Sequence, residues 1–117
     1  VKRRRHGVRL NRQFGFTGER SHNTRNTMST IYKYPLEPGN NEIMAPAGAR
    51  LLDVQMQNGT PCLWALVDPD QPPRRILLSI YGTGRGMPDE PGKYVGTFQL
   101  EGGALVWHLF ETARERS

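Results

Sequence analysis

The glycine-rich stretch Gly82-Thr83-Gly84-Arg85-Gly86 is the part of the sequence whose residue types best suit ligand chemistry. Glycines let successive backbone N–H groups converge on an anion, and an arginine side chain can pair with a phosphate. The candidate ligand-binding residues are therefore Thr83, Arg85 and Lys93. The spacing matches neither phosphate-loop motif, however, and Met87-Pro88 prevents a following helix from contributing its dipole. The alternative interpretation is a long, flexible loop between two strands.

The histidines and acidic residues form no recognisable catalytic or metal-binding set. His108 lies in an apolar run, and no carboxylate or nucleophile stands at a local spacing that would make it a general base. We predict a core or interface histidine. Asp68-Pro69-Asp70 fits turn chemistry, and one cysteine with three histidines gives no zinc signature. The sequence thus predicts a protein that is not an enzyme and that binds no metal or cofactor.

Charge divides the chain near residue 27. Residues 1–27 hold eight Lys/Arg and one acid, a net charge of +7, whereas residues 28–117 have a net charge of −2. Nucleic acid is therefore a predicted partner only through residues 1–27. The cations expected to contact phosphates there are Lys2, Arg3, Arg4, Arg5, Arg9 and Arg12.

The leading segment, residues 1–28, has few apolar residues and no periodicity, so by itself it should be disordered. Three interpretations stay open. It could be a basic arm that orders on a nucleic acid or a partner protein, an arm that docks on neighbouring subunits, or a translated leader ahead of the true start. Met28-Ser29-Thr30 opens the patterned region directly and would be a natural initiator.

From Thr30 onwards, short apolar runs alternate with turn residues, a pattern typical of β-strands. The run over residues 51–57 alternates strictly and places Leu52, Val54 and Met56 on one face. Asn58-Gly59 predicts a two-residue hairpin, and Gly102-Gly103 predicts a second one. The predicted strands cover residues 30–34, 41–44, 51–57, 60–67, 74–81, 93–100 and 104–110.

These strands predict a mainly β fold, a single small antiparallel β-sandwich or barrel of about seven strands with a disordered or docked basic N-terminal arm. Sequential hairpins favour a meander. The domain is expected over residues 29–113, with residues 114–117 as a tail and the charged end from Glu111 as a frayed helical turn or tail. Cys62 lies in an apolar strand, which indicates a buried thiol in a reducing compartment. No run is long enough to cross a bilayer, so no membrane partner is expected.

The strands over residues 60–67 and 104–110 are apolar on both faces. So short a chain cannot hide that much apolar surface in one small sandwich, so we predict self-association into a homo-oligomer. Several aromatic side chains could instead stack bases, although packing between neighbouring strands is their commoner role. These aromatic residues are Tyr32, Tyr34, Trp64, Tyr81, Tyr94 and Trp107.

Five sequence blocks in series resemble a family of short, uncharacterised proteins of tailed bacteriophages and prophages. The blocks are IYKYPL (31–36), LWALVD (63–68), YGTG (81–84), YVGTF (94–98) and GALVWHLFE (103–111). The resemblance implies a phage or prophage origin and action in the cytoplasm of a bacterial host or in the virion. It implies no activity. Members of that family begin near Met28, so the long basic segment departs from their pattern.

The first functional hypothesis is a non-catalytic phage or prophage accessory protein that binds a host protein or a small ligand, for example in host takeover or anti-defence. It would act as a homo-oligomer. The alternative is a virion or nucleic-acid-associated protein that uses the basic N-terminal arm.

Overall fold

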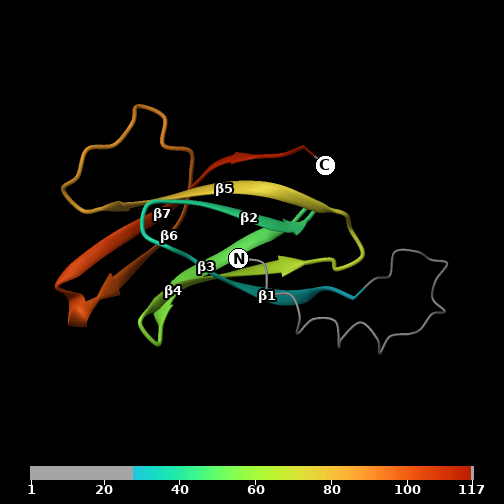
Figure 1. The fold of residues 1–117 in the computed structure, drawn as a ribbon, viewed down its shortest axis with the longest axis horizontal. Coiled ribbons are helices and arrows are strands. Elements are labelled where there is room, and N and C mark those ends of the chain that lie inside the picture. Colours follow the sequence, from blue (N-terminus) through green and yellow to red (C-terminus); the bar gives the residue numbers. More distant parts are fainter. Residues whose placement is uncertain (1–27, 117) are drawn as a thin grey trace.

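The computed structural model describes residues 28–116 and folds them into seven β-strands (Figure 1). Within these residues the helical structure is a single 3-10 turn, η3, at Glu101–Gly103, so the predicted mainly β class is confirmed. No helix in this part of the chain is long and apolar enough to cross a membrane. The strands are β1 (Thr30–Pro35), β2 (Asn40–Pro46), β3 (Arg50–Gln57), β4 (Thr60–Val67), β5 (Pro73–Gly82), β6 (Lys93–Leu100) and β7 (Leu105–Arg114).

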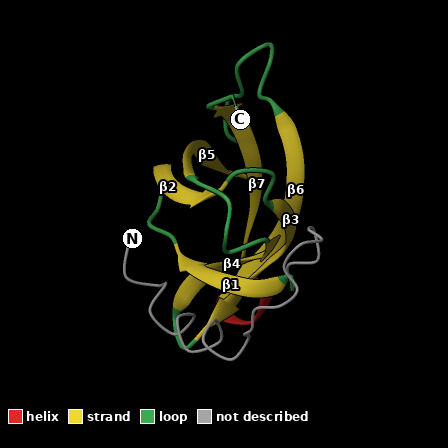
Figure 2. Ribbon diagram, turned by 90° about the vertical axis from the view of Figure 1, so that its right-hand side faces the viewer, coloured by secondary structure: helices red, strands yellow, loops and turns green. Residues whose placement is uncertain are grey.

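The strands form two antiparallel sheets, as expected for a sandwich. One has three strands in the order β1-β4-β3, and the other has four in the order β2-β5-β7-β6. Figure 2 shows the sheets stacked, with β1 and β4 on one side of the molecule and β2, β5 and β7 on the other. β4, whose sequence is apolar on both faces, is the central strand of its sheet.

The connections do not follow the predicted meander. Only β3–β4 and β6–β7 are hairpins between neighbouring strands. The β1–β2, β2–β3 and β4–β5 connections pass from one sheet to the other, and the chain from β5 to β6 passes across β7. The physical reason is that a single sheet of seven strands would leave one apolar face open. Two stacked sheets bury their inward faces against each other.

The core lies between the two sheets and is built from alternate side chains of each strand. Its fully buried members come from both sheets, and burying each side chain of this size contributes about 1.5–3 kcal/mol. They are Val54, Leu63, Val67, Ile76, Leu78, Phe98 and Leu109. In β5, Ile76, Leu78 and Ile80 share the inward face.

Bulges interrupt the alternation in three strands. The register shifts between Leu51 and Asp53 in β3, between Tyr94 and Gly96 in β6, and opposite Leu77/Leu78 in β7. The prediction that Leu52 faces the core with Val54 and Met56 is wrong, because the β3 bulge leaves Leu52 42% exposed. A bulge inserts an unpaired residue, so side chains on either side of it no longer alternate.

The Asn58-Gly59 hairpin is confirmed. Gln57 pairs with Thr60, and Asn58 and Gly59 both take positive φ, 51° and 82°, as a two-residue turn of this type requires. The prediction of a two-residue hairpin at Gly102-Gly103 is wrong, because Leu100 pairs with Leu105 and leaves a four-residue loop. Both glycines do take positive φ, but a 3-10 turn beginning at Glu101 lengthens the connection.

The charged residues from Glu111 to Arg114 continue β7. The prediction that they form a helical turn or a tail is therefore wrong. Arg114 pairs with Ile76, and the Glu115 N–H donates to the Arg75 carbonyl at 2.8 Å. The Arg114 guanidinium donates to the Glu111 carboxylate and to the Ala49 carbonyl. These bonds satisfy the charged groups and let a polar segment complete a strand.

The two sheets approach most closely where β3 passes β6. Gly96 is buried in β6, and a Cβ atom there would lie 2.9 Å from Cγ1 of Val54. Val54 is fully buried and β-branched, so its side chain has little freedom to move away. A glycine at position 96 is therefore required for the sheets to close on this side.

We expect Gly96→Ala to lower the free energy of unfolding by about 1–3 kcal/mol through overpacking against Val54. This cost exceeds the gain of about 0.4–1 kcal/mol from a less flexible unfolded chain. Urea unfolding measures the change. Gly86→Ala is the control, because no atom lies within 4 Å of a Cβ there and its φ is not positive. Equal stabilities of the two variants would contradict this account of the closure.

Cys62 is buried, as the sequence predicted, and its thiol is free. Burial raises the pKa of the Cys62 thiol, and the nearby Lys33 ammonium lowers it by a smaller amount. The unfolded thiol therefore ionises at lower pH than the folded one. Its contribution to stability is complete below the unfolded pKa of about 8.5 and declines as the pH rises above that value.

A thiol reagent such as DTNB should therefore modify Cys62 far more slowly in the native protein at pH 8 than in concentrated urea, because the thiolate is the nucleophile. In Gln57→Cys, an exposed position of β3 supplies a second thiol in the same molecule. The expected time course has one fast and one slow thiol. Two equally fast thiols at pH 8 would show that Cys62 is accessible.

Candidate functional site

The outer face of the four-stranded sheet carries a cluster of aromatic and hydroxyl side chains. They point outwards because they alternate with core residues such as Ile80 and Leu109. All of them are half-buried or exposed. We call this surface the aromatic face and define it by Tyr81 and Thr83 at the end of β5, Tyr94 and Thr97 of β6, and His108 and Phe110 of β7.

Three aromatic rings form a row across the sheet. Phe110 of β7 lies between the other two, with centroid distances of 6.0 Å to Tyr81 and 5.6 Å to Tyr94. The planes meet at 69° and 67°, the edge-to-face arrangement that the ring quadrupoles favour, worth about 0.5–1.5 kcal/mol per pair. Tyr94 nevertheless remains 56% exposed, so the row presents open aromatic surface to a partner.

His108 lies beside this row and both of its ring nitrogens are engaged. Nε2 lies 2.7 Å from the Thr83 hydroxyl, and Nδ1 lies 3.0 Å from the Thr97 hydroxyl. The Thr97 hydroxyl is in turn 2.6 Å from the Tyr94 phenol oxygen. One chain of hydrogen bonds therefore crosses from the end of β5 through β7 to β6.

The Thr83 hydroxyl also donates to the Val106 carbonyl at 3.2 Å. The donor in each contact of His108 depends on which ring nitrogen carries a proton. In every case the two threonine hydroxyls fix the orientation of the imidazole ring from both sides.

The β6 bulge makes this chain possible. Residues three apart in a regular strand point to opposite faces, so Tyr94 and Thr97 could not meet there. The register shift between Tyr94 and Gly96 adds one residue and brings both side chains to the outer face. Tyr94 then lies opposite Phe110, and Thr97 lies opposite His108.

Within the described residues, the hydrogen bonds of His108 go to two threonine hydroxyls and not to a carboxylate. A catalytic histidine is hydrogen-bonded to the nucleophile that it activates and is oriented by a third group, commonly a carboxylate. The arrangement suits a rigid recognition surface with one face of an imidazole and three rings on display.

The candidate ligand-binding residues of the glycine-rich loop are not brought together. Thr83 joins the aromatic face through His108, opposite Val106. Lys93 lies opposite Glu111, which is five residues further along β7 and so about 16 Å away. Arg85 follows Thr83 in a turn in which its N–H donates to the Gly82 carbonyl at 3.1 Å, and its side chain lies over Gly82. Only Thr83 of the three is part of the candidate site.

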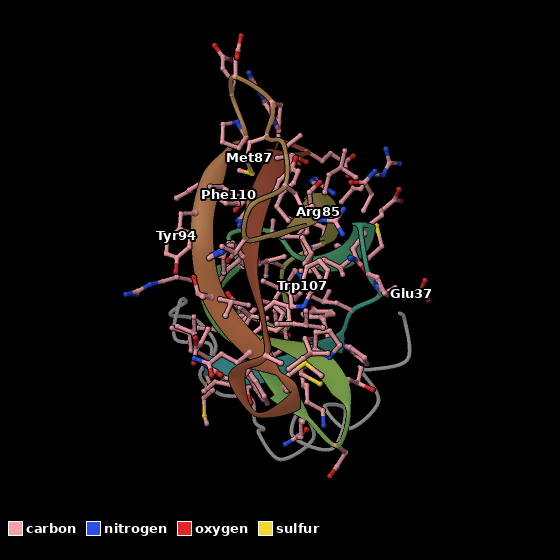
Figure 3. All side chains as sticks on the ribbon, turned by 90° about the vertical axis from the view of Figure 1, so that its left-hand side faces the viewer. Glu37, Arg85, Met87, Tyr94, Trp107 and Phe110 are labelled. Atoms are coloured by element: carbon pink, nitrogen blue, oxygen red, sulfur yellow. The ribbon has the colours of Figure 1, made fainter. Side chains whose placement is uncertain are left out.

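Trp107 lies on the inner side of β7, and Figure 3 shows it on the opposite side of the β6–β7 ribbon from Tyr94. Its ring packs against Gly82, where a Cβ would lie 3.1 Å from the indole. The indole Nε1 is buried and has no hydrogen-bond partner within the described residues. Like Tyr32 and Tyr34, which pack into the core, it is not available for stacking.

Asp68 lies in a turn, as the sequence predicted. The Asp68 carboxylate accepts from the Asp70 N–H at 3.1 Å and from the Gln71 side chain, which are turn contacts. Residues 28–116 contain no cluster of three or more His, Cys, Asp or Glu side chains that could hold a metal ion. The basic residues Lys2, Arg3, Arg4, Arg5, Arg9 and Arg12 lie outside the described part of the chain.

Sequence reasoning missed Thr97 and Phe110 as parts of this site, and it read His108 only as a core or interface residue. The available signal was the two-sided apolar character of residues 104–110, which left His108 and Phe110 outside the core. No local signal marked Thr97, because its place depends on the bulge in its own strand.

No curated protein sequence and no solved structure shows significant similarity to the chain. A protein-family model does match it over residues 28–117, which include all seven strands and the aromatic face. The chain therefore belongs to the family described as a domain of unknown function, DUF7352.

Proposed function

We propose that this domain is a non-catalytic binding protein that holds a partner protein on its aromatic face. The observation that carries the proposal is the row Tyr81–Phe110–Tyr94, left open on the surface while hydrogen bonds through His108 fix its surroundings. Interfaces concentrate their binding energy in such aromatic residues, and a face that is already ordered loses little entropy on binding.

A protein partner fits the charge of this surface better than a polyanion. None of the six residues that define the aromatic face is Asp, Glu, Lys or Arg. Arg75 and Glu42, on the neighbouring strands of the same sheet, pair with each other at 3.2 Å. Binding a phosphate backbone would require cations on the face. A neutral centre with a polar margin is instead typical of protein interfaces.

The resemblance to phage and prophage proteins suggests the class of partner and the biological role. The partner is then a host protein in the bacterial cytoplasm, and the domain is an accessory factor acting in host takeover or anti-defence.

A photo-crosslinking amino acid, p-benzoylphenylalanine, placed at Tyr94 of the full chain in bacterial cells should give one discrete protein adduct. The same residue at Gln71, exposed in the turn between β4 and β5, is the positional control. Adding Phe110→Ala to the Tyr94 probe should remove most of the adduct, because losing a central aromatic costs about 2 kcal/mol or more of binding energy. Adducts of equal yield from both positions, or none from Tyr94, would refute a partner on this face.

A second function is favoured by the division of charge. Residues 1–27 have a net charge of +7 and the rest of the chain −2, which is the distribution of a domain with an arm that binds nucleic acid. In this alternative the protein is part of the virion or associates with nucleic acid, and the affinity comes from the arm.

Fluorescence anisotropy with a 20-nucleotide single strand tests this alternative. Changing Lys2, Arg3, Arg4, Arg5, Arg9 and Arg12 together to Gln in the full chain should weaken binding at least tenfold and flatten its dependence on salt, because fewer counterions are released. Tyr94→Ala, which leaves the arm intact, is the matched control. Unchanged affinity of the arm variant would exclude the arm as the binding element.

A further inference from the structure

The outer face of the three-stranded sheet is a second surface with a composition of its own. Its central row runs from Lys33 of β1 through Trp64 of β4 to Asp53 of β3, all in one register. The adjoining row runs from Ile31 of β1 through Leu66 of β4 to the exposed Arg50 of β3, and the β3 bulge adds Leu52. We call this the Trp64 face: Ile31, Lys33, Leu52, Asp53, Trp64 and Leu66. It lies on the opposite side of the sandwich from the aromatic face.

The centre of the Trp64 face is apolar and incompletely covered. Ile31 is 54% exposed and Leu52 is 42% exposed, while Trp64 and Leu66 between them are half-buried. Single exposed apolar residues are ordinary on protein surfaces. Four on three neighbouring strands make one continuous patch, which marks an interaction site.

Two opposite charges stand in the central row of this face and are not paired with other charges within the described domain. Lys33 and Asp53 stand on either side of Trp64, and neither forms an ion pair with another residue of 28–116. Lys33 donates instead to the Gln57 side chain, and Asp53 only accepts a long hydrogen bond of 3.5 Å from Gln55. Both charges therefore remain available to an incoming surface.

Two copies of this face are complementary when they stack about a two-fold axis parallel to β4. That axis places β1 of each copy over β3 of the other. Lys33 of each copy then lies opposite Asp53 of the other, and the two Trp64 side chains pack together. An axis across the strands would instead lay Lys33 on Lys33 and Asp53 on Asp53. Sheets stack in this way about 10 Å apart with their strands nearly aligned.

We propose that the Trp64 face is where a second copy of this chain docks, forming a two-fold dimer with an axis along β4 and reciprocal Lys33–Asp53 pairs. The apolar centre supplies the affinity, and the two charge pairs select this orientation over the alternative. The inference assigns a surface and a symmetry to self-association. It does not depend on the partner proposed for the aromatic face.

Reversing the charge of Lys33 or of Asp53 in the full chain tests the proposed dimer. Sedimentation equilibrium of the unaltered protein between about 1 and 100 µM should give a dimer. Lys33→Asp and Asp53→Lys should each weaken dimerisation at least tenfold, because each alone opposes like charges in both pairs. A one-to-one mixture of the two variants should regain the dimer as a mixed species, since every pair is then again opposite in charge.

Two controls keep the result specific. Circular dichroism of each variant verifies the fold, and Glu42→Lys changes an exposed acid on the other sheet and should leave the dimer intact. A monomer throughout this concentration range would overturn the proposal, as would a mixture that does not regain the dimer. Dimerisation lost on Phe110→Ala but kept in both charge variants would place the contact on the aromatic face and also overturn it.

Discussion

The whole molecule depends on the burial of one face of each strand between two stacked sheets. Side chains alternate along a strand, so a two-layer sandwich covers only half of the positions in any strand. β4 and β7 carry apolar residues on both faces, and the second set, including Trp64 and Phe110, must therefore lie outside. The aromatic face and the Trp64 face are both consequences of this single constraint.

Much of this fold was predictable from alternation and turn chemistry. The seven strands, the central place of β4 and the tight turn at Asn58-Gly59 each follow from residues within a few positions of one another. The predictions are wrong at positions whose structure depends on pairing with a strand that is distant in the sequence. Leu52 is turned outwards by a bulge against β4, and Arg114 becomes part of a strand because β5 and the Ala49 carbonyl bind it.

The candidate site was less predictable, for the same reason. His108 is bound by Thr83, 25 residues earlier, and by Thr97, 11 residues earlier, and only the pairing of three strands brings these side chains together. A shift of one residue in register would move every one of them to the other face. The residue types of the glycine-rich loop suit an anion, yet its two ends meet β7 at different points: Thr83 lies at Val106 and Lys93 lies opposite Glu111.

The positions of the two surfaces bear on how the protein could act. The Trp64 face and the aromatic face belong to different sheets and point in opposite directions. A dimer joined through the Trp64 faces would therefore present its two aromatic faces outwards, on opposite sides of the assembly. Such a molecule holds two copies of its partner at a fixed separation. Against a partner that is itself oligomeric, the second contact would form at high effective concentration, so even a modest single-site affinity could give a long-lived complex.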